Sequence, residues 1–263
     1  MPLALRRSAR LLAILAHLAL GIALARTVLI WASRCSVRGA HWRAGIAQSW
    51  IRRLNRLLRV RIIIHGSISE TPTLFVANHI SWLDITCLHA ALGADFVAKQ
   101  EVAHWPLVGA MAREAGTMFL RRGDPCATEA VADRITWLLK RGRSAILFPE
   151  GTTTDGTSVR RFHSRLYLSA LRTHAHIQAV AIAYPHPAGV NPAAPFVGDD
   201  DLARHLWRLL AEPSIDVTLT FLPRVTAAGF GSRRAVAEYT RSQIAAALGI
   251  DTAPRLLRAA GGD

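Results

Sequence analysis

A histidine and an aspartate five residues apart are the first candidates for catalytic chemistry in this sequence. His79 follows a short apolar run that ends at Ala77, and Asp84 falls in the first turn of a predicted helix. A carboxylate beside an imidazole can fix the imidazole tautomer and leave the other ring nitrogen free to accept a proton. The pair is therefore a candidate general base. The segment S-W-L-D at 81–84 also fits the S-x-x-D pattern of a helix start, so a purely capping role for Asp84 stays open.

A second polar cluster follows another apolar run. The sequence F-P-E-G-T-T-T at 148–154 places one carboxylate, one glycine and three hydroxyls at a strand exit, with Glu150, Gly151 and Thr152 at its centre. Glycine lets a backbone approach a ligand closely, so the segment can build a small polar pocket. By itself, it could equally be an ordinary turn.

Other kinds of catalytic site find little support. The sequence has no G-x-S-x-G segment, and Cys87 lies in an apolar helical stretch without a neighbouring base, which favours a buried hydrophobe over a nucleophile. The cysteines form no C-x-x-C pair, which argues against a disulfide framework and a cysteine-based zinc site and fits a reducing compartment. His174 and His176 give only a weak metal signal, so we expect no metal.

Strand and helix patterns alternate along the part of the chain that carries these residues. Apolar, β-branched runs predict strands over 61–65, 73–77, 95–99, 117–120, 144–148, 177–184 and 215–221. Helical patterns cover 82–92, 105–114, 128–141, 164–173, 201–211 and 233–248. This alternation predicts an α/β fold with a mixed, largely parallel sheet flanked by helices on both faces. The proline-rich stretch 185–195 is expected to be a surface loop.

Positive charge is concentrated at the N-terminus. The chain has 263 residues, 51% of them hydrophobic, which excludes disorder, collagen and coiled coil. Twelve arginines and no acidic residue precede position 62, so this segment supplies +12 of the net charge of +14. We therefore expect three parts: a membrane-associated anchor at 1–60, a catalytic domain at 61–250 and a tail at 251–263.

The N-terminal segment has the composition of a membrane anchor. Residues 11–25 carry no charge, which is short of the roughly 20 residues that span a bilayer, so a span and a shallow insertion are both open. Residues 42–59 alternate apolar and arginine positions at helical spacing, as in a helix lying on an anionic interface. This pattern favours a monotopic anchor. The side chains expected to contact the membrane are Trp31, Trp42, Trp50, Arg52, Arg53 and Arg56.

This segment has three alternative explanations. A signal peptide would end at Ala23-Leu24-Ala25, but the apolar run continues past that site. A nucleic-acid-binding arm would not contain such an uncharged run. A plain amphipathic helix packed on the body is compatible with membrane contact.

Three ordered motifs together resemble the glycerolipid acyltransferases, whose best-known members are the 1-acyl-sn-glycerol-3-phosphate acyltransferases. N-H-x4-D at 78–84, G-x-x-F-x-x-R at 116–122 and F-P-E-G-T at 148–152 match the family in order and spacing, and the resemblance covers about residues 40–250. Ala179 stands where the family usually has a proline. The segment D-D-D-L at 199–202 and its continuation resemble a bacterial subgroup that includes lyso-ornithine lipid acyltransferases.

The resemblance implies a function. His79 would be the general base on the hydroxyl of a lysolipid, Asp84 would orient it, and the hydroxyl would attack an acyl thioester directly. Arg122 would bind a phosphate, since guanidinium matches phosphate geometry. The acceptor pocket would be completed by Asn78, Gly116, Phe119, Glu150, Gly151 and Thr152. We expect no cofactor, with acyl-CoA or acyl carrier protein as co-substrate.

The acceptor expected first is lysophosphatidate, which would give phosphatidate, and lyso-ornithine lipid comes second. A lyso-ornithine acceptor would weaken the case for Arg122, because that lipid has a carboxylate and no phosphate. A membrane esterase and a non-catalytic lipid-binding module are more distant alternatives. The expected location is the cytoplasmic face of a bacterial inner membrane, on an anionic lipid surface and without nucleic acid.

Overall fold

The fold is that of a computed structural model, which describes residues 3–32, 38–99, 103, 109, 117–120 and 125–251. Its helices and strands follow in the order α1 (Leu3–Ala32), α2 (Arg38–Leu57), β1 (Val60–His65), β2 (Thr73–Ala77), α3 (Leu83–Leu92), β3 (Asp95–Lys99), β4 (Met118–Leu120), α5 (Pro125–Lys140), β5 (Ala145–Leu147), η2 (Ser164–Tyr167), α6 (Leu168–Thr173), β6 (His176–Ala183), β7 (Pro185–His186), β8 (Gly189–Val190), α7 (Leu202–Leu209), β9 (Ile215–Phe221), β10 (Val225–Thr226), η3 (Ala227–Gly229) and α8 (Arg233–Ala247).

Most strands join one sheet, in the order β1-β9-β6-β2-β5-β3-β4, with β10 pairing to β6. The pairs of β6 with β9 and with β10 are antiparallel, and the other pairs in this sheet are parallel. The predicted class, a mixed and largely parallel sheet, is confirmed. The predicted strands 73–77, 95–99 and 215–221 match the observed bounds, and the predicted helix 105–114 lies largely outside the described residues.

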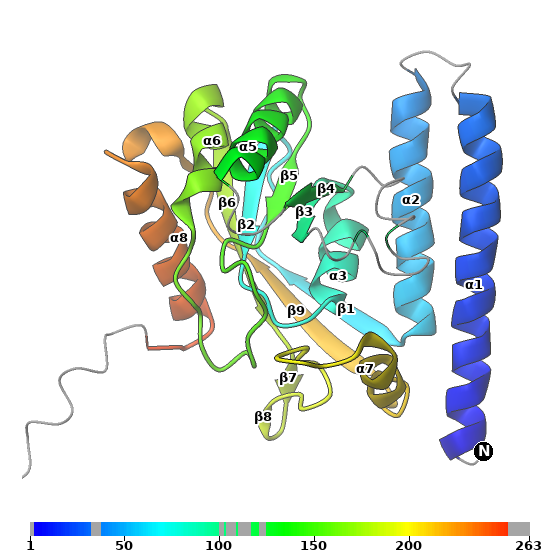
Figure 1. Cartoon of the computed structure of the whole chain (residues 1–263). Helices are drawn as coiled ribbons and strands as arrows, with labels where there is room; N and C mark the ends of the chain where they lie inside the picture. Colours follow the sequence, from blue (N-terminus) through cyan, green and yellow to red (C-terminus); the bar gives the residue numbers. More distant parts are fainter. Residues whose placement is uncertain are drawn as a thin grey trace, which may run out of the picture.

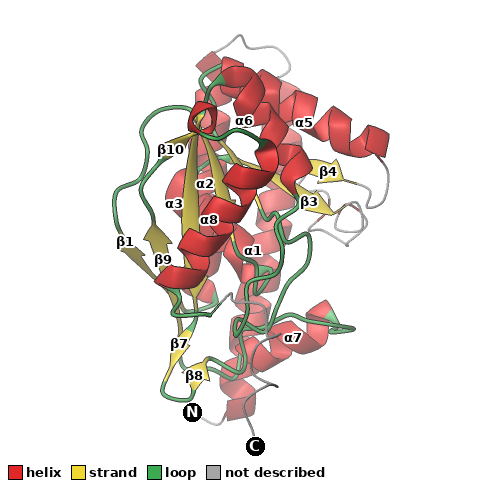
Figure 2. Cartoon of the chain, turned by 90° about the vertical axis from the view of Figure 1, so that its left-hand side faces the viewer, coloured by secondary structure: helices red, strands yellow, loops and turns green. Residues whose placement is uncertain are grey.

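Helices cover the sheet on both faces (Figure 1). One hydrophobic core joins the sheet to α1, α2, α3 and α7. The other joins it to α5, α6 and α8, and α8 lies across the sheet in the view of Figure 2. In the central strand β2, Phe75 and Ala77 face the first core, while Leu74 and Val76 face the second. This explains why β2 is a continuous apolar run, because both of its faces are buried.

The N-terminal helix α1 is docked on the body along one face and lies beside α2 (Figure 1). Arg6 donates to the carbonyl of Ala211 at 2.7 Å, and Arg10 donates to that of Leu210 at 2.9 Å, just beyond α7. Further along the same face, Ile14 is buried and His17 stacks on Trp50 of α2 at 4.2 Å. The opposite face is apolar and exposed, and its leucines are Leu5, Leu12, Leu15, Leu20 and Leu24.

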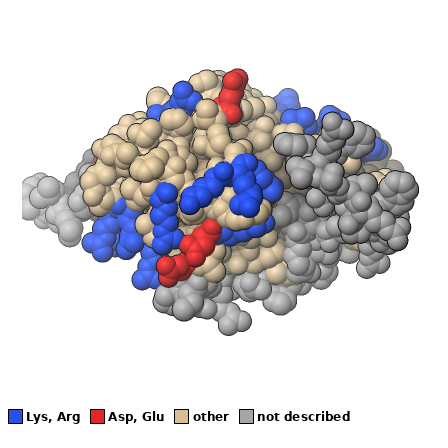
Figure 3. Space-filling model, turned by 90° about the horizontal axis from the view of Figure 1, so that it is seen from above, with Lys and Arg blue, Asp and Glu red and all other residues tan. Residues whose placement is uncertain are grey.

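By length and composition, residues Leu3–Leu24 of α1 could cross a membrane, and 11% of the most apolar window in this stretch is buried. The body also carries basic side chains, and patches of Lys and Arg are visible from above (Figure 3).

The prediction of a surface loop over 185–195 is wrong in part. Strands β7 and β8 form a short antiparallel hairpin there. After the hairpin, the chain turns inward, and Asn191, Ala193 and Ala194 are buried. The Asn191 amide donates to the carbonyl of Tyr184, and the Asn191 side chain accepts from the amide of Ala193. The asparagine therefore satisfies the local backbone, which allows this polar segment to be buried.

Candidate active site

The two polar motifs meet because the strands that precede them are neighbours. Strands β2 and β5 are parallel and pair Val76 with Leu147, so the segments that follow them leave the same edge of the sheet. Thr154 donates its backbone amide to the carbonyl of His79 at 2.8 Å, which ties the second motif to the first. Ligand sites in open α/β sheets form at this edge, beyond the carboxyl ends of the strands.

His79 and Asp84 lie side by side, as their spacing predicts. His79 Nδ1 is 2.8 Å from Asp84 Oδ2. The same oxygen accepts the backbone amides of Ile80 at 2.7 Å and Ser81 at 2.9 Å. Capping and orientation are therefore not exclusive roles, because one oxygen of Asp84 secures the helix start and also contacts the imidazole.

Tyr184 is a further partner of Asp84 that the sequence patterns did not reveal. Its hydroxyl donates to Asp84 Oδ1 at 2.6 Å, and both side chains are buried. Burial, followed by the charge of Asp84, raises the pKa of Tyr184 well above its usual value, so this hydroxyl remains a donor. The sequence shows only that a tyrosine ends a predicted strand. It does not indicate the partner of that tyrosine, because Asp84 lies 100 residues away in the chain.

The imidazole of His79 is held in one orientation. A carboxylate can only accept, so Nδ1 carries the hydrogen and Nε2 has a free lone pair. Among the described residues, Nε2 has no hydrogen-bond partner. The ring stacks on Phe148 with centroids 4.0 Å apart, and 13% of the His79 side chain is exposed. The geometry is that of a general base that can receive a proton from a substrate hydroxyl.

Glu150 connects the two motif segments through their backbones. It is buried, with Oε1 accepting the amide of His79 and Oε2 accepting that of Arg160, both at 2.9 Å. Burial raises the pKa of Glu150 to about 7, against the lowering effect of these two amides. With both oxygens engaged, the Glu150 carboxylate positions the His79 segment from within the protein.

The remaining residues predicted for the acceptor pocket occupy different settings. The Asn78 side chain is buried and bonds in both directions to the backbone of Ile182, which fixes the exit of β2 against β6. Gly151 has a φ of 66°, a conformation that favours glycine. Thr152 and Phe119 are half-buried. Gly116 and Arg122 lie outside the described residues, so binding of the acceptor by this set stays a prediction.

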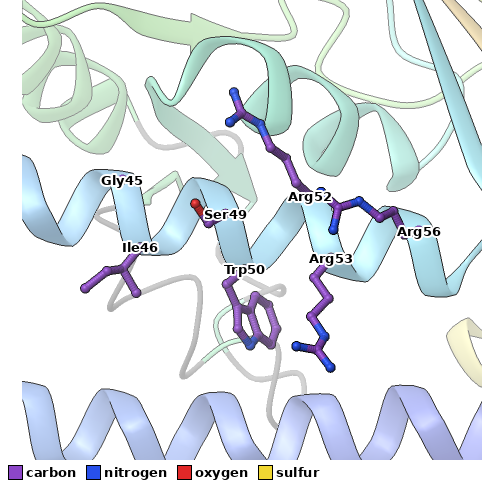
Figure 4. A pocket seen from close by; sticks show the side chains of 7 residues that line it. All are labelled: Gly45, Ile46, Ser49, Trp50, Arg52, Arg53 and Arg56. Atoms are coloured by element: carbon purple, nitrogen blue, oxygen red, sulfur yellow. The ribbon is translucent and has the colours of Figure 1, made fainter.

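The predicted membrane-contact residues are divided between packing and exposure. Trp50 is half-buried and stacks on His17 of α1, while Arg52 donates to the carbonyl of Ala90 at the end of α3. Arg53 and Arg56 are exposed and line an open hollow of about 790 Å³ beside α2 (Figure 4). The side chains of Trp31 and Trp42 lie outside the described part of the chain.

Cys87 lies near the pair but is not arranged as a nucleophile. Its side chain is buried, and burial, followed by the charge of Asp84, raises the pKa of the thiol. This agrees with a small buried hydrophobe. Within the described residues, no group of three or more His, Cys, Asp or Glu side chains could hold a metal ion.

Comparison with known proteins decides the family. Residues 59–183 match the family model described as Acyltransferase. A lyso-ornithine lipid O-acyltransferase from Pseudomonas aeruginosa is 38% identical over 256 residues, which are 97% of each chain. The chain belongs to the acyltransferase family. A 1-acyl-sn-glycerol-3-phosphate acyltransferase from Neisseria gonorrhoeae is another relative, 33% identical over 68% of this chain and 70% of its own length.

The fold of this acyltransferase also has a solved counterpart. The crystal structure of the 1-acyl-sn-glycerophosphate (LPA) acyltransferase PlsC from Thermotoga maritima aligns with a TM-score of 0.66 at 20% identity. It covers 92% of this chain and 96% of its own. The predictions of the family and of an acyltransferase enzyme are thus confirmed. The apolar helix α1 and the membrane-lipid relatives indicate that this acyltransferase associates with membranes.

Proposed function

We propose that the enzyme transfers a fatty acyl group from a thioester to the hydroxyl of a lysolipid, with His79 as the general base. The observation that supports this role is the 2.8 Å contact of His79 Nδ1 with Asp84, which leaves Nε2 available. Nε2 takes the hydroxyl proton while the hydroxyl oxygen attacks the thioester carbonyl. The C–S bond then breaks, and the leaving thiolate takes the proton from the imidazolium. No acyl-enzyme, metal or cofactor takes part, and the donor is a thioester of coenzyme A or acyl carrier protein.

The acceptor that we propose is lyso-ornithine lipid. The relative from Pseudomonas aeruginosa supports it, because the similarity extends over 97% of both chains and includes the N-terminal helices. A lyso-ornithine lipid O-acyltransferase from Rhodobacter capsulatus adds support, at 33% identity over 94% of this chain. This reverses the order of acceptors that the motifs favoured.

Lysophosphatidate is the second candidate acceptor. It is supported by the Neisseria relative and by Arg122, whose motif position in the family fits a phosphate ligand. On a lyso-ornithine acceptor, Arg122 would instead face a carboxylate, which a guanidinium also binds well.

The membrane attachment that we propose is monotopic, on the cytoplasmic face of a bacterial inner membrane. Arg6 and Arg10 bond to carbonyls at the end of α7, so a crossing by α1 would draw these parts of the body into the hydrocarbon core. An α1 helix lying in one leaflet would instead bury its exposed leucine face in lipid and leave Arg53 and Arg56 for anionic headgroups. Accordingly, a variant that carries both Arg53→Gln and Arg56→Gln should dissociate from anionic vesicles at a lower salt concentration than the wild type does.

A competition assay tests the proposed function. Membranes carrying the protein receive a labelled acyl thioester together with equal amounts of lyso-ornithine lipid and lysophosphatidate, and His79→Ala membranes serve as the blank. Label that enters ornithine lipid in excess over phosphatidate, and only with His79 intact, supports the proposal. Label in phosphatidate alone reassigns the acceptor, and label in neither refutes lysolipid acylation.

A further inference from the structure

Trp82, inside the N-H-x4-D segment, is bonded to a residue far along the chain. Its indole Nε1 donates to Nδ1 of His205, on α7, at 3.0 Å. Trp82 lies between His79 and Asp84 in the chain and directly precedes the first residue of α3, Leu83. The side chain of His205 is fully buried, although imidazole is polar. A buried polar side chain of this kind must have both nitrogens satisfied.

The partners of His205 fix its tautomer. An indole N–H can only donate, so Nδ1 of His205 must be an unprotonated acceptor. Nε2 lies 3.1 Å from the carbonyl of Pro195 and 3.2 Å from that of Ala194, and carbonyls can only accept. Nε2 therefore carries the hydrogen, and the ring is neutral. Burial, followed by the charge of Arg208, lowers the pKa of His205, which keeps this neutral form dominant.

The carbonyls that His205 holds belong to a segment that contacts both catalytic motifs. The amide of Phe196, the next residue, donates to the carbonyl of Ile80 at 2.9 Å. The hydroxyl of Thr153 donates to the carbonyl of Phe196. Arg208 of α7 donates to the Pro195 carbonyl at 2.9 Å, on the same side as His205. This segment is therefore connected to the first motif at Ile80, to the second at Thr153, and to α7 through two side chains.

We propose that His205 is a positioning residue for acyl transfer, which holds the His79–Asp84 segment in its active geometry by accepting from Trp82 and donating to the Pro195 carbonyl. The carbonyl of Ile80 accepts from the amide of Phe196, and the amide of Ile80 donates to Asp84. A displacement of the 194–196 segment would therefore be transmitted to the catalytic carboxylate through Ile80 alone. His205 touches no reacting atom. It determines where Asp84 holds the imidazole, and misplacement of a catalytic group by about 1 Å can cost 10²-fold in rate.

A double-mutant cycle tests this role. Trp82→Phe keeps an aromatic ring but removes the N–H donor, His205→Phe removes both ring nitrogens, and a third variant carries both changes. Trp137→Phe is the matched control, because its indole is exposed on α5. Each variant is purified in full length, and kcat and the KM of the acyl thioester are measured with whichever lysolipid the wild type acylates. The folded fraction is determined by circular dichroism.

Each single variant should lower kcat by about 10- to 100-fold, with little change in the KM of the thioester, and Trp137→Phe should match the wild type. The double variant should lose no more than the larger single loss, since both changes break one connection. Losses that multiply would overturn the proposal, as would a Trp82→Phe enzyme with normal kcat or a loss that equals the loss of folded protein. If His205→Phe fails to fold, Trp82→Phe alone decides.

The proposal rests on the base mechanism proposed for His79, and His79→Ala in the same assay separates the two. A normal rate for His79→Ala would refute the base mechanism, whatever the Trp82 variant shows. An inactive His79→Ala enzyme together with a fully active Trp82→Phe enzyme would refute only the proposed role of His205.

Discussion

Replacing Asp84 by asparagine should produce a stable but slow enzyme. The carboxylate accepts three N–H donors on Oδ2 and the Tyr184 hydroxyl on Oδ1. An asparagine whose oxygen takes the Oδ2 position can keep all three N–H bonds, and Tyr184 can turn its hydroxyl to accept from the new amide. Because the three N–H bonds and the contact with Tyr184 are kept, the free energy of unfolding should fall by only about 1 kcal/mol.

The rate should fall much more, because the amide has no charge to stabilise the imidazolium that forms when His79 takes a proton. At a charge separation of about 4 Å and an effective dielectric constant of about 20, that attraction is worth about 4 kcal/mol. Each 1.36 kcal/mol is a factor of ten, so kcat should drop by about 10³-fold.

The assay for this variant combines initial rates of labelled acyl transfer with urea unfolding on the same preparation. The expected result is a nearly unchanged unfolding midpoint with a loss of about three orders of magnitude in kcat. A folded Asp84→Asn enzyme within tenfold of the wild type would refute the reasoning, because the carboxylate would then serve only the helix start.

Three further predictions concern neighbours of the pair. Tyr184→Phe removes one donor to a buried carboxylate, so it should cost about 1.5–3 kcal/mol of stability in urea unfolding and lower kcat by about tenfold; an unchanged midpoint would mean that the 2.6 Å contact contributes nothing. The pKa of Glu150 is raised by burial from 4.5 to about 7, so folded Glu150 keeps a proton that the unfolded chain loses. Its contribution to stability should therefore decline by up to about 3 kcal/mol as the pH rises from about 4.5 to about 7, and Glu150→Gln should remove that part of the pH slope in unfolding measured between pH 4.5 and 8. Cys87→Ala should keep normal kcat, since the thiol is buried and unused; an inactive but folded Cys87→Ala enzyme, or labelled acyl group recovered on Cys87, would contradict direct transfer.

Local patterns in the sequence were sufficient to predict the sheet and the principal pair. Every residue of strand β2 is buried because helices cover both faces of the sheet. Its first and last residues could therefore be predicted from the run of apolar residues. The side-by-side placement of His79 and Asp84 depends on a separation of five residues and on a helix start, both of which are local features.

The partners that support this pair could not be predicted, because they depend on long-range packing. Tyr184 and His205 reach the first motif from 100 and 123 residues away, through the order of strands and the position of α7. The burial of residues after the β7–β8 hairpin was missed for a related reason. Proline and asparagine indicate a turn, but they do not indicate whether another element will cover it.

The backbone partners of Glu150 could not be predicted from its motif. Its place in F-P-E-G-T predicts a position in the acceptor pocket, which stays a prediction, while the structure shows that its two oxygens accept backbone amides from the His79 and Arg160 segments. The choice of these partners depends on which backbone groups the fold leaves without partners, and spacing along the chain does not contain that information.

The most direct test of the central claim compares the acyl-transfer rates of His79→Ala and His65→Ala enzymes of verified fold, at saturating thioester and lysolipid. His65 is an exposed histidine at the end of β1 and serves as the matched control. The account predicts a loss of about 10²–10⁴-fold for His79→Ala and a normal rate for His65→Ala. A folded His79→Ala enzyme that acylates the lysolipid at a rate close to that of the wild type would contradict it.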